Sequence, residues 1–359
     1  MDKWSLDSNK LLWHMDRVID YFEKGIRVPP ILIDIGLTKY CNARCLYCYG
    51  EYQKPTKDRI PDEILLKFMK DAPEAGVKSL TLTGDGEPTI HPVWDRAIVI
   101  GKANGLDIGM ATNGIALTDR HYGMCCDNLV WTRFNISASN KHSYKRMHGV
   151  DMFKTVINNI SNMVKVRDTY KSRMTIGLQT VLIPQGINDV IPLAKLAIKL
   201  GVDYYVIKQF SDPESKEGSA IPVSGVRHER YVRKSMDILR TAEGMSNEKT
   251  QIIPKYKLLA LNNKRTYPYC VDLPFIFQIS GNGHCYPCGF LFNNEKYCYG
   301  DLNTQGFKDI ISSEHYWNII NKIRNTHTKK LCPTGCCRHD STNAFCTNYL
   351  NKPPHLNFI

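Results

Sequence analysis

Residues 37–48 read Leu-Thr-Lys-Tyr-Cys-Asn-Ala-Arg-Cys-Leu-Tyr-Cys and carry three cysteines, Cys41, Cys45 and Cys48, with the spacing C-x3-C-x2-C. Thiolate sulfur is a soft ligand that binds iron–sulfur clusters or zinc. Ferredoxin-type carriers use a fourth cysteine for each cubane, so a cluster held here would leave one iron open to another ligand. A zinc site or a disulfide is the alternative, but a zinc finger needs a second ligand pair at short range, and none follows.

The chain has 359 residues and a hydrophobic content of 43%, which suits one large globular domain plus a smaller one. No segment is long and apolar enough to span a membrane, so no membrane partner is expected. The N-terminus lacks a basic segment followed by an apolar one, which predicts a cytoplasmic protein. Thirteen cysteines in a reducing compartment indicate metal ligands before disulfides.

The formal net charge of +12 would attract an anionic partner, such as a nucleic acid, a phosphorylated small molecule or an acidic peptide. A solvated basic surface explains the same charge without a partner. Basic residues are spread along the chain, with one mild concentration over residues 227–240, and no basic repeat with interleaved aromatic residues is present.

Short apolar runs rich in β-branched residues alternate with longer amphipathic ones from residue 31 onward. Strands are predicted at residues 31–36, 77–83, 107–112, 129–137, 174–182 and 204–208. Helices are predicted at residues 8–24, 61–75, 91–104, 118–127, 153–167, 188–200 and 226–243. Six strand–helix repeats imply a parallel sheet covered by helices, either a partial (β/α)6 barrel or an open doubly wound sheet.

Polar clusters favour the barrel, because each follows the C-terminal end of a predicted strand. These clusters are residues 41–48, 84–88, 112–114 and 137–140. That rim is where barrel enzymes build their active sites. The predicted fold is therefore an α/β partial (β/α)6 barrel with a small, cysteine-rich α+β domain at the C-terminus.

The cysteine spacing, with the aromatic Tyr47 just before the third cysteine, resembles the radical S-adenosylmethionine (radical SAM) superfamily. By that resemblance, the open iron of a [4Fe–4S] cluster on Cys41, Cys45 and Cys48 binds the amino and carboxylate groups of SAM. One electron then breaks a carbon–sulfur bond of SAM, giving methionine and a 5′-deoxyadenosyl radical that abstracts hydrogen from substrate. The resemblance implies a radical SAM enzyme served by a reducing partner such as flavodoxin or ferredoxin.

Residues 84–88, Gly-Asp-Gly-Glu-Pro, look like the GGEP motif by which the family contacts the SAM amino group, with Asp85 inserted between the glycines. Glycine lets backbone groups approach closely, and Glu87 can accept hydrogen bonds from an ammonium. A glycine turn between strand and helix is the alternative interpretation. The resemblance implies that Gly86, Glu87, Asn113 and Ser137 contact SAM, and that Tyr47 touches the adenine with its backbone or fills space beside the cluster. An ordinary Asn-Gly turn and a helix-capping serine are the alternatives for Asn113 and Ser137. Gln179 is a further candidate SAM contact. Gln179 and Lys208 either face the barrel interior or lie on the surface.

Eight of the thirteen cysteines lie in the last ninety residues, where such density suggests a metal-stabilised domain. The pattern resembles SPASM and Twitch domains, which implies one auxiliary [4Fe–4S] cluster on Cys270, Cys288, Cys332 and either Cys336 or Cys337. A zinc ribbon on Cys285, Cys288, Cys332 and Cys336 is the alternative. The remaining thiols Cys285, Cys298 and Cys346 are candidate hydrogen donors to a substrate radical, or are structural.

The same region predicts a hairpin over residues 275–288 with its turn at 281–283, an amphipathic helix over 307–324, and a polar, then extended, tail. Three domains are expected: a helical extension (1–30), the barrel (31–245) and the auxiliary cluster domain (246–359).

The expected activity is reductive cleavage of SAM followed by hydrogen abstraction from a small polar substrate: a sugar, an aminocyclitol or a nucleoside. Epimerisation, dehydrogenation and rearrangement all fit, and the catalytic residues are unknown. Maturation of a ribosomal peptide and modification of nucleic acid are alternatives, and no recognisable leader-binding domain precedes the barrel. An iron–sulfur electron carrier or redox sensor is the alternative that is not an enzyme.

Overall fold

A single curved sheet of ten strands organises the molecule, in the order β10-β9-β8-β1-β2-β3-β4-β5-β6-β7. The computed structural model describes residues 8–48, 50, 55–210, 229–256, 265, 267–332, 337–352, 354–355 and 357. Its first seven strands, which pair in parallel, are β1 (Leu32–Ile35), β2 (Ser79–Leu82), β3 (Asp107–Thr112), β4 (Trp131–Asn135), β5 (Thr175–Leu182), β6 (Tyr204–Gln209) and β7 (Gln251–Pro254). The edges are β10 and β7, so the sheet in the described ranges is a partial barrel, as predicted.

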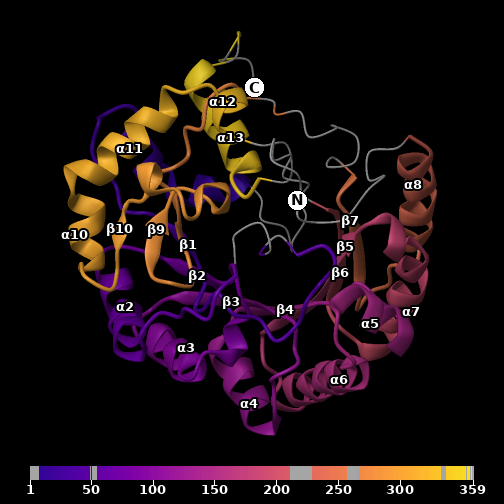
Figure 1. The fold of residues 1–359 in the computed structure, drawn as a ribbon. Coiled ribbons are helices and arrows are strands. Elements are labelled where there is room, and N and C mark those ends of the chain that lie inside the picture. The colour runs from indigo at the N-terminus through magenta and orange to yellow at the C-terminus, as the bar shows by residue number, and fades with distance from the viewer. Residues whose placement is uncertain are drawn as a thin grey trace.

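Helices cover the outer face of this sheet (Figure 1). They are α2 (Asp62–Glu74), α3 (Trp94–Ala103), α4 (Asp119–Asn128), α5 (Lys141–His148), α6 (Phe153–Tyr170), α7 (Val190–Leu200) and α8 (Glu229–Glu243). In α2, for example, the buried stripe is Leu65, Phe68, Met69 and Ala72. The strand–helix alternation predicted from the apolar periodicity is confirmed, and β3 has the predicted bounds.

The C-terminal half extends the same sheet. Its strands are β8 (Ile276–Ile279), β9 (His284–Tyr286) and β10 (Gly300–Asp301). Strand β8 pairs in parallel with β1, with Leu32 opposite Ile276, and β9 returns antiparallel as the predicted hairpin. Strand β7 lies beyond residue 245, which was the predicted end of the barrel, and yet it pairs with β6. The three domain boundaries stay a prediction, because one sheet runs through both halves of the chain.

The helices of the C-terminal half are α10 (Phe307–Ser312), α11 (Glu314–Arg324), α12 (Thr328–Leu331) and α13 (Asp340–Asn351). The single helix expected over 307–324 is wrong, because Ser313 has extended dihedrals and caps α11 by accepting a hydrogen bond from Tyr316 N. No helix was predicted for the polar start of the tail, where α13 buries Thr342, Asn343 and Cys346 on one face. Side-chain burial at this helical spacing stabilises a segment that its polar sequence did not predict.

The N-terminal segment begins as a 3-10 helix, η1 (Ser8–His14), and continues as α1 (Met15–Phe22), where one α-helix over 8–24 was predicted. A 3-10 turn is common at a helix start. Arg17 fixes the segment by donating to the carbonyl oxygens of Pro29 and Gly76. The other short 3-10 helices are η3 (Pro88–Ile90), η4 (Pro184–Asp189), η5 (Gly289–Leu291) and η6 (Glu295–Tyr297).

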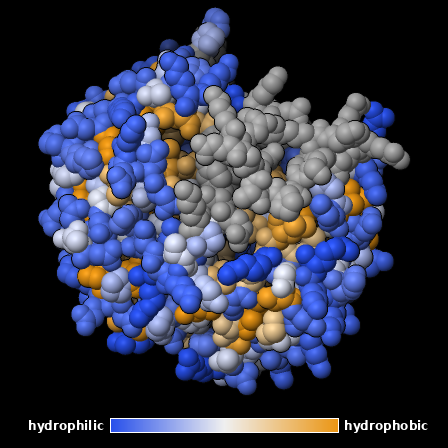
Figure 2. All heavy atoms as spheres, in the orientation of Figure 1, coloured by the Kyte–Doolittle hydropathy of each residue, from blue (hydrophilic) through white to orange (hydrophobic). Residues whose placement is uncertain are grey.

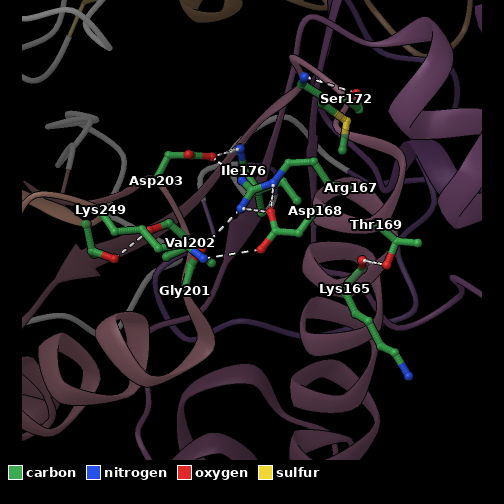
Figure 3. Close-up of polar contacts among 12 residues, drawn as sticks. Lys165, Arg167, Asp168, Thr169, Ser172, Ile176, Gly201, Val202, Asp203 and Lys249 are labelled. Atoms are coloured by element: carbon green, nitrogen blue, oxygen red, sulfur yellow. Dashed lines mark hydrogen bonds and ion pairs between the residues drawn. The ribbon is translucent and has the colours of Figure 1, made fainter.

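A buried arginine joins α6 to the far strands of the sheet (Figure 3). Arg167 is 5% exposed and donates to the Asp203 carboxylate and, at 2.9 Å, to Asp168 Oδ1. Lys249 also donates to Asp168, at 3.2 Å. Asp203 in turn accepts from the backbone N–H of Ile176 at 2.7 Å. Because its charges are paired, this network connects α6, β5 and the segment before β7.

The face shown in Figure 2 is largely hydrophilic, with apolar residues in small separate patches. No helix in the described ranges is long and apolar enough to cross a membrane.

Candidate functional site

One cavity of about 410 Å³ brings together residues predicted from both ends of the sequence. It lies at the C-terminal ends of the parallel strands, where the barrel site was expected. The predicted site residues that line it are Cys41, Cys45, Tyr47, Cys48, Gly86, Glu87, Asn113, Gln179, Cys288 and Cys337. The N-terminal and C-terminal cysteine groups therefore face the same space.

The three-cysteine loop follows β1 and is held by the C-terminal end of α5, a helix that was not predicted. The backbone N–H groups of Arg44 and Leu46 donate to the carbonyl oxygens of His148 and Met147, each at 2.9 Å. Gly149 then ends α5 with φ +72°, and a Cβ there would lie 2.6 Å from the carbonyl oxygen of Arg44. The loop and the helix end thus pack backbone to backbone, which only glycine permits at this position.

The thiols of this loop are buried in a way that favours bound metal over free thiolate. Burial and the nearby Glu87 raise the pKa of Cys41 to about 12, and burial also raises the pKa of Cys45. A thiolate is the form that binds metal, so a cluster here would have to supply the positive charge that stabilises it. The residues present fit such a group, because three sulfurs converge on one cavity.

The spacing of these sulfurs does not suit one zinc ion. Two sulfurs on the same zinc ion lie at most about 4.6 Å apart, twice the zinc–sulfur bond length. Within the described part of the chain, the group of three potential ligands closer than 4.8 Å to one another is Cys270, Asp272 and His339, and the loop cysteines form no such group.

Glu87 is 3% exposed and accepts four hydrogen bonds from the protein. Its Oε1 accepts from Thr89 N (3.1 Å), Thr89 Oγ1 (2.6 Å) and Thr112 Oγ1 (2.6 Å), and its Oε2 accepts from Asn113 N at 2.7 Å. Burial nevertheless raises the pKa of this carboxyl group. The carboxylate therefore ties the loops after β2 and β3 together, and Oε2, with one donor, keeps room for another.

The glycines around Glu87 are required by close backbone contacts. A Cβ on Gly86 would lie 2.2 Å from the carbonyl oxygen of Thr38 and 2.5 Å from that of Tyr40. Gly86 thus lets the loop after β2 pack directly against the cysteine loop, and Glu87 N donates to Tyr40 O at 2.9 Å.

Asp85, the residue that departs from the GGEP pattern, links this loop to the C-terminal hairpin. Its Oδ2 accepts from Ser280 Oγ at 2.7 Å and its Oδ1 from Gly281 N at 2.9 Å. Burial raises the pKa of Asp85. The inserted aspartate therefore joins the barrel to the turn between β8 and β9.

Asn113 and Tyr47, two further predicted SAM contacts, lie beside the cysteine loop. Asn113 Nδ2 donates to Asn42 Oδ1 at 2.6 Å and approaches Cys41 Sγ at 3.7 Å. Tyr47 is 5% exposed, and its hydroxyl accepts from Asn135 Nδ2 at 3.2 Å.

The last two predicted SAM contacts differ in their access to the cavity. Ser137 is fully buried, does not line the cavity, and accepts from Val181 N at 3.1 Å. Gln179 lines the cavity and lies 3.4 Å from Asn135 Oδ1. Of these two side chains, Gln179 alone is placed to meet a ligand there.

Sequence reasoning missed several other charged and polar side chains that line the cavity. Asp34 of β1, Arg133 of β4 and Gln278 of β8 line it, and so does Arg338 between the C-terminal cysteines and α13. Lys208 of β6, for which an interior position was one of two possibilities, lines it too. A polar residue inside a strand that is otherwise apolar, such as Asp34 between Ile33 and Ile35, was the available signal.

The C-terminal cysteines form a second group. Burial, and then the charges of Cys337 and Cys332, raise the pKa of Cys288. Burial, Asp272 and Cys337 similarly raise the pKa of Cys270, whose sulfur accepts from Asn343 Nδ2 at 3.3 Å. The structure thus brings Cys270, Cys288, Cys332 and Cys337 together, whereas Cys336 lies outside the described residues.

Cys285 lies apart from that group. It is fully buried in β9, and its sulfur approaches the carbonyl oxygen of Gly283 at 3.8 Å. Burial, and then the charge of Cys298, raise its pKa. This position gives no support to the alternative in which Cys285 and Cys288 bind one zinc ion.

His339 and Asp272 form a buried pair next to Cys270. His339 Nδ1 lies 2.9 Å from Asp272 Oδ1, and His339 Nε2 lies 3.0 Å from the carbonyl oxygen of Pro287. The pair connects α13 to the segments that carry Cys270 and Cys288.

Comparisons with known families agree with both cysteine groups. Residues 35–197 match the model of the radical SAM superfamily, and residues 270–338 match the SPASM model, described as an iron–sulfur cluster-binding domain. These two ranges hold the loop after β1, the loops that surround Glu87, and Cys270, Cys288 and Cys337.

Curated relatives resemble the chain at low identity. A probable GTP 3′,8-cyclase of Thermococcus kodakarensis is 27% identical over 192 residues, which are 53% of this chain and 60% of the relative. The match thus spans less than two thirds of the cyclase. A tungsten-containing aldehyde ferredoxin oxidoreductase cofactor-modifying protein of Pyrococcus furiosus is 23% identical over 79% of this chain and 81% of the relative.

Solved structures share the fold. Streptococcus suis SuiB bound to the precursor peptide SuiA has a TM-score of 0.68 at 15% identity, covering 96% of this chain and 79% of SuiB. The structure of anSMEcpe with bound AdoMet has a TM-score of 0.61 at 17% identity, covering 90% of this chain and 95% of that one.

Proposed function

Since this chain is a radical SAM enzyme with a C-terminal SPASM domain, we propose that it abstracts hydrogen from a small polar substrate that carries an anionic group. The observation that carries the proposal is the shared cavity. The three-cysteine loop and Glu87 line it together with the charged side chains of Asp34, Arg133, Lys208 and Arg338. When bound, the [4Fe–4S] cluster and SAM together supply the 5′-deoxyadenosyl radical.

In this proposal Cys41, Cys45 and Cys48 hold the SAM-binding cluster, and Cys270, Cys288, Cys332 and Cys337 hold the auxiliary one. Glu87 Oε2, which has one donor from the protein, accepts from the SAM ammonium. Asn113 and Gln179 contact other polar groups of SAM from the ends of β3 and β5. The partner that supplies the electron is a reduced flavodoxin or ferredoxin.

The surroundings of Arg133 are evidence that the substrate carries an anionic group. Its Nε is buried, and in the described part of the chain no group accepts a hydrogen bond from it. The guanidinium lies 5.4 Å from the ring centre of Trp131, which holds it in the cavity wall. An unsatisfied buried donor costs about 1–3 kcal/mol, and a carboxylate or phosphate matches the guanidinium fork. A ligand anion would remove that cost.

The charge balance of the cavity supports the same substrate class. Asp34 already accepts two hydrogen bonds from Arg338, and Glu87 is enclosed by four donors. Arg133 adds a further positive side chain to the cavity wall, and Lys208 lines the same cavity. The relative named for GTP acts on a phosphorylated small molecule, in keeping with an anionic substrate.

An assay of SAM cleavage tests the proposed radical chemistry. Anaerobically reconstituted and reduced protein should convert SAM to 5′-deoxyadenosine and methionine, measured by liquid chromatography. Cys45→Ala should abolish the conversion, and Cys126→Ala, which removes a buried thiol of α4, should retain it. A wild-type protein that forms no 5′-deoxyadenosine, even with candidate substrates present, would contradict the proposal.

Arg133→Met tests the substrate class. Sugar phosphates, nucleotides and small carboxylates are screened for faster 5′-deoxyadenosine formation, and Arg133→Met should lose at least tenfold of any acceleration, whereas Arg133→Lys should keep part of it. The affinity for SAM should be the same in Arg133→Met as in the wild type. A lower SAM affinity would indicate that Arg133 binds the SAM carboxylate and not the substrate. Stimulation by a precursor peptide or an RNA, and by no small anion, would overturn the small-molecule proposal.

A further inference from the structure

His148 lies between the cysteine loop and β4 and contacts both. It is the last residue of α5 and is fully buried. Its Nδ1 lies 3.2 Å from Cys45 Sγ, and its Nε2 lies 3.1 Å from the backbone nitrogen of Ser137. The ring therefore bridges a cysteine of the loop and the end of β4.

The partner at Nε2 fixes where the ring carries its proton. The backbone N–H of Ser137 can only donate, so Nε2 must offer its lone pair to it. The Tyr47 hydroxyl, 3.5 Å away, lies on the same side of the ring. In the neutral imidazole the single N–H is then on Nδ1, and it points to Cys45 Sγ as a donor.

Two aromatic rings hold the imidazole in this orientation. Tyr144 stacks on it, with ring centres 4.2 Å apart and an angle of 18° between the planes. Tyr47 meets it edge to face at 5.8 Å. The carbonyl of His148 is fixed as well, because it accepts from Arg44 N at 2.9 Å. The donor is thus preorganised by its stacking, by its backbone and by the Ser137 hydrogen bond.

We propose that His148 is a positioning residue that donates an N–H···S hydrogen bond to Cys45 and thereby raises the reduction potential of the SAM-binding cluster. The inference rests on the proposed role of Cys45 as a ligand. Reduction adds negative charge to the cluster sulfurs, and an N–H dipole stabilises the more negative state. In a buried site, with little water to screen it, this effect is strong.

Potentiometry on the intact protein tests the inference. The cluster is identified as the one whose EPR signal changes when SAM is added and disappears in Cys45→Ala. His148→Phe keeps a ring but has no donor, so its midpoint potential should shift in the negative direction. His148→Asn places an amide N–H near the Nδ1 position and should restore part of the shift. His142→Phe, on the exposed face of α5, is the matched control and should leave the potential unchanged.

A measurement on the wild-type protein does not depend on any variant folding. With 15N-labelled histidine, electron–nuclear double resonance of the reduced cluster should detect one weakly coupled histidine nitrogen, and the coupling should be absent in His148→Asn. An unshifted potential in His148→Phe at wild-type iron content, or no coupled nitrogen in the wild type, would overturn the inference. A SAM-responsive signal that survives Cys45→Ala would instead overturn the ligand assignment.

Discussion

Arg338, next to Cys337 in the C-terminal half, donates two hydrogen bonds to Asp34 in the first strand of the barrel. Nε bonds to Oδ2, and Nη2 bonds to Oδ1 at 3.2 Å. The side chain of Asp34 is 9% exposed and that of Arg338 20%. This bidentate pair lies in the wall of the common cavity and connects the segment after Cys337 to β1.

Removing one member of this pair should cost more than removing both. Arg338→Met leaves the Asp34 carboxylate buried without its partner, for which we expect a loss of about 3–5 kcal/mol in the free energy of unfolding. Asp34→Asn combined with Arg338→Met should recover at least half of that loss. Urea unfolding of the two single variants and the double variant measures the coupling, and additive losses would contradict the interaction.

Cysteine substitutions distinguish an auxiliary cluster from a zinc ribbon. Cys288→Ala should lower the iron content by about four atoms per chain, because Cys288 is grouped with Cys332 and Cys337. Cys285→Ala should leave iron unchanged, because Cys285 lies near Cys298 instead. Iron, sulfide and zinc analysis of both variants provides the measurement. Loss of zinc in both, with iron unchanged, would favour the ribbon.

The sequence predicted those parts of the molecule that local patterns determine. Apolar periodicity predicted the alternation of strands and helices, and β3 has the predicted bounds. The spacing of Cys41, Cys45 and Cys48 placed the candidate site at the end of the first strand, because the carboxyl ends of parallel strands meet at one rim. The expected auxiliary cysteines Cys270 and Cys288 also lie together without being adjacent in sequence.

Features that depend on tertiary contacts were not predictable. Helix α5 is short and polar, yet its end holds the cysteine loop through the carbonyl oxygens of Met147 and His148. In the sequence, Asp85 was only a departure from the GGEP motif. Its structural role could not be predicted, because its partners Ser280 and Gly281 are about two hundred residues away. Helix α13 is stabilised by burial of Asn343 and Cys346 against distant segments, which its polar composition does not reveal.

The Arg167 network predicts a specific dependence of stability on pH. Burial alone would raise the pKa of Asp168, but hydrogen bonds from Arg167 and Lys249 outweigh it and hold that pKa below its usual value. A lowered folded-state pKa stabilises the protein above the unfolded-state pKa of about 3.9, and this stabilisation is lost as pH falls through the folded-state value.

Asp168→Asn should therefore destabilise the protein near pH 7 and have no effect well below pH 3. The difference should stay under about 1 kcal/mol, because the side chain of Asp168 is 47% exposed. Urea unfolding at both pH values is the measurement, with Asp127→Asn as an exposed control on α4. A difference that persists at low pH would argue against a charge effect.

Glu87→Gln should be damaging even though it preserves shape. Each carboxylate oxygen accepts from one backbone N–H, Oε1 from Thr89 and Oε2 from Asn113. A glutamine amide has one acceptor oxygen, so either orientation leaves one of these N–H groups facing an NH2. We expect a loss of about 1–3 kcal/mol in the free energy of unfolding.

The same substitution removes the negative charge proposed to bind the SAM ammonium, so SAM affinity should fall at least tenfold. Urea unfolding and calorimetric titration with SAM measure the two effects separately. Glu248→Gln, at an exposed position, is the matched control and should change neither. A Glu87→Gln protein of reduced stability that binds SAM as tightly as the wild type would leave Glu87 a structural role only, in which its four hydrogen bonds join the loops after β2 and β3.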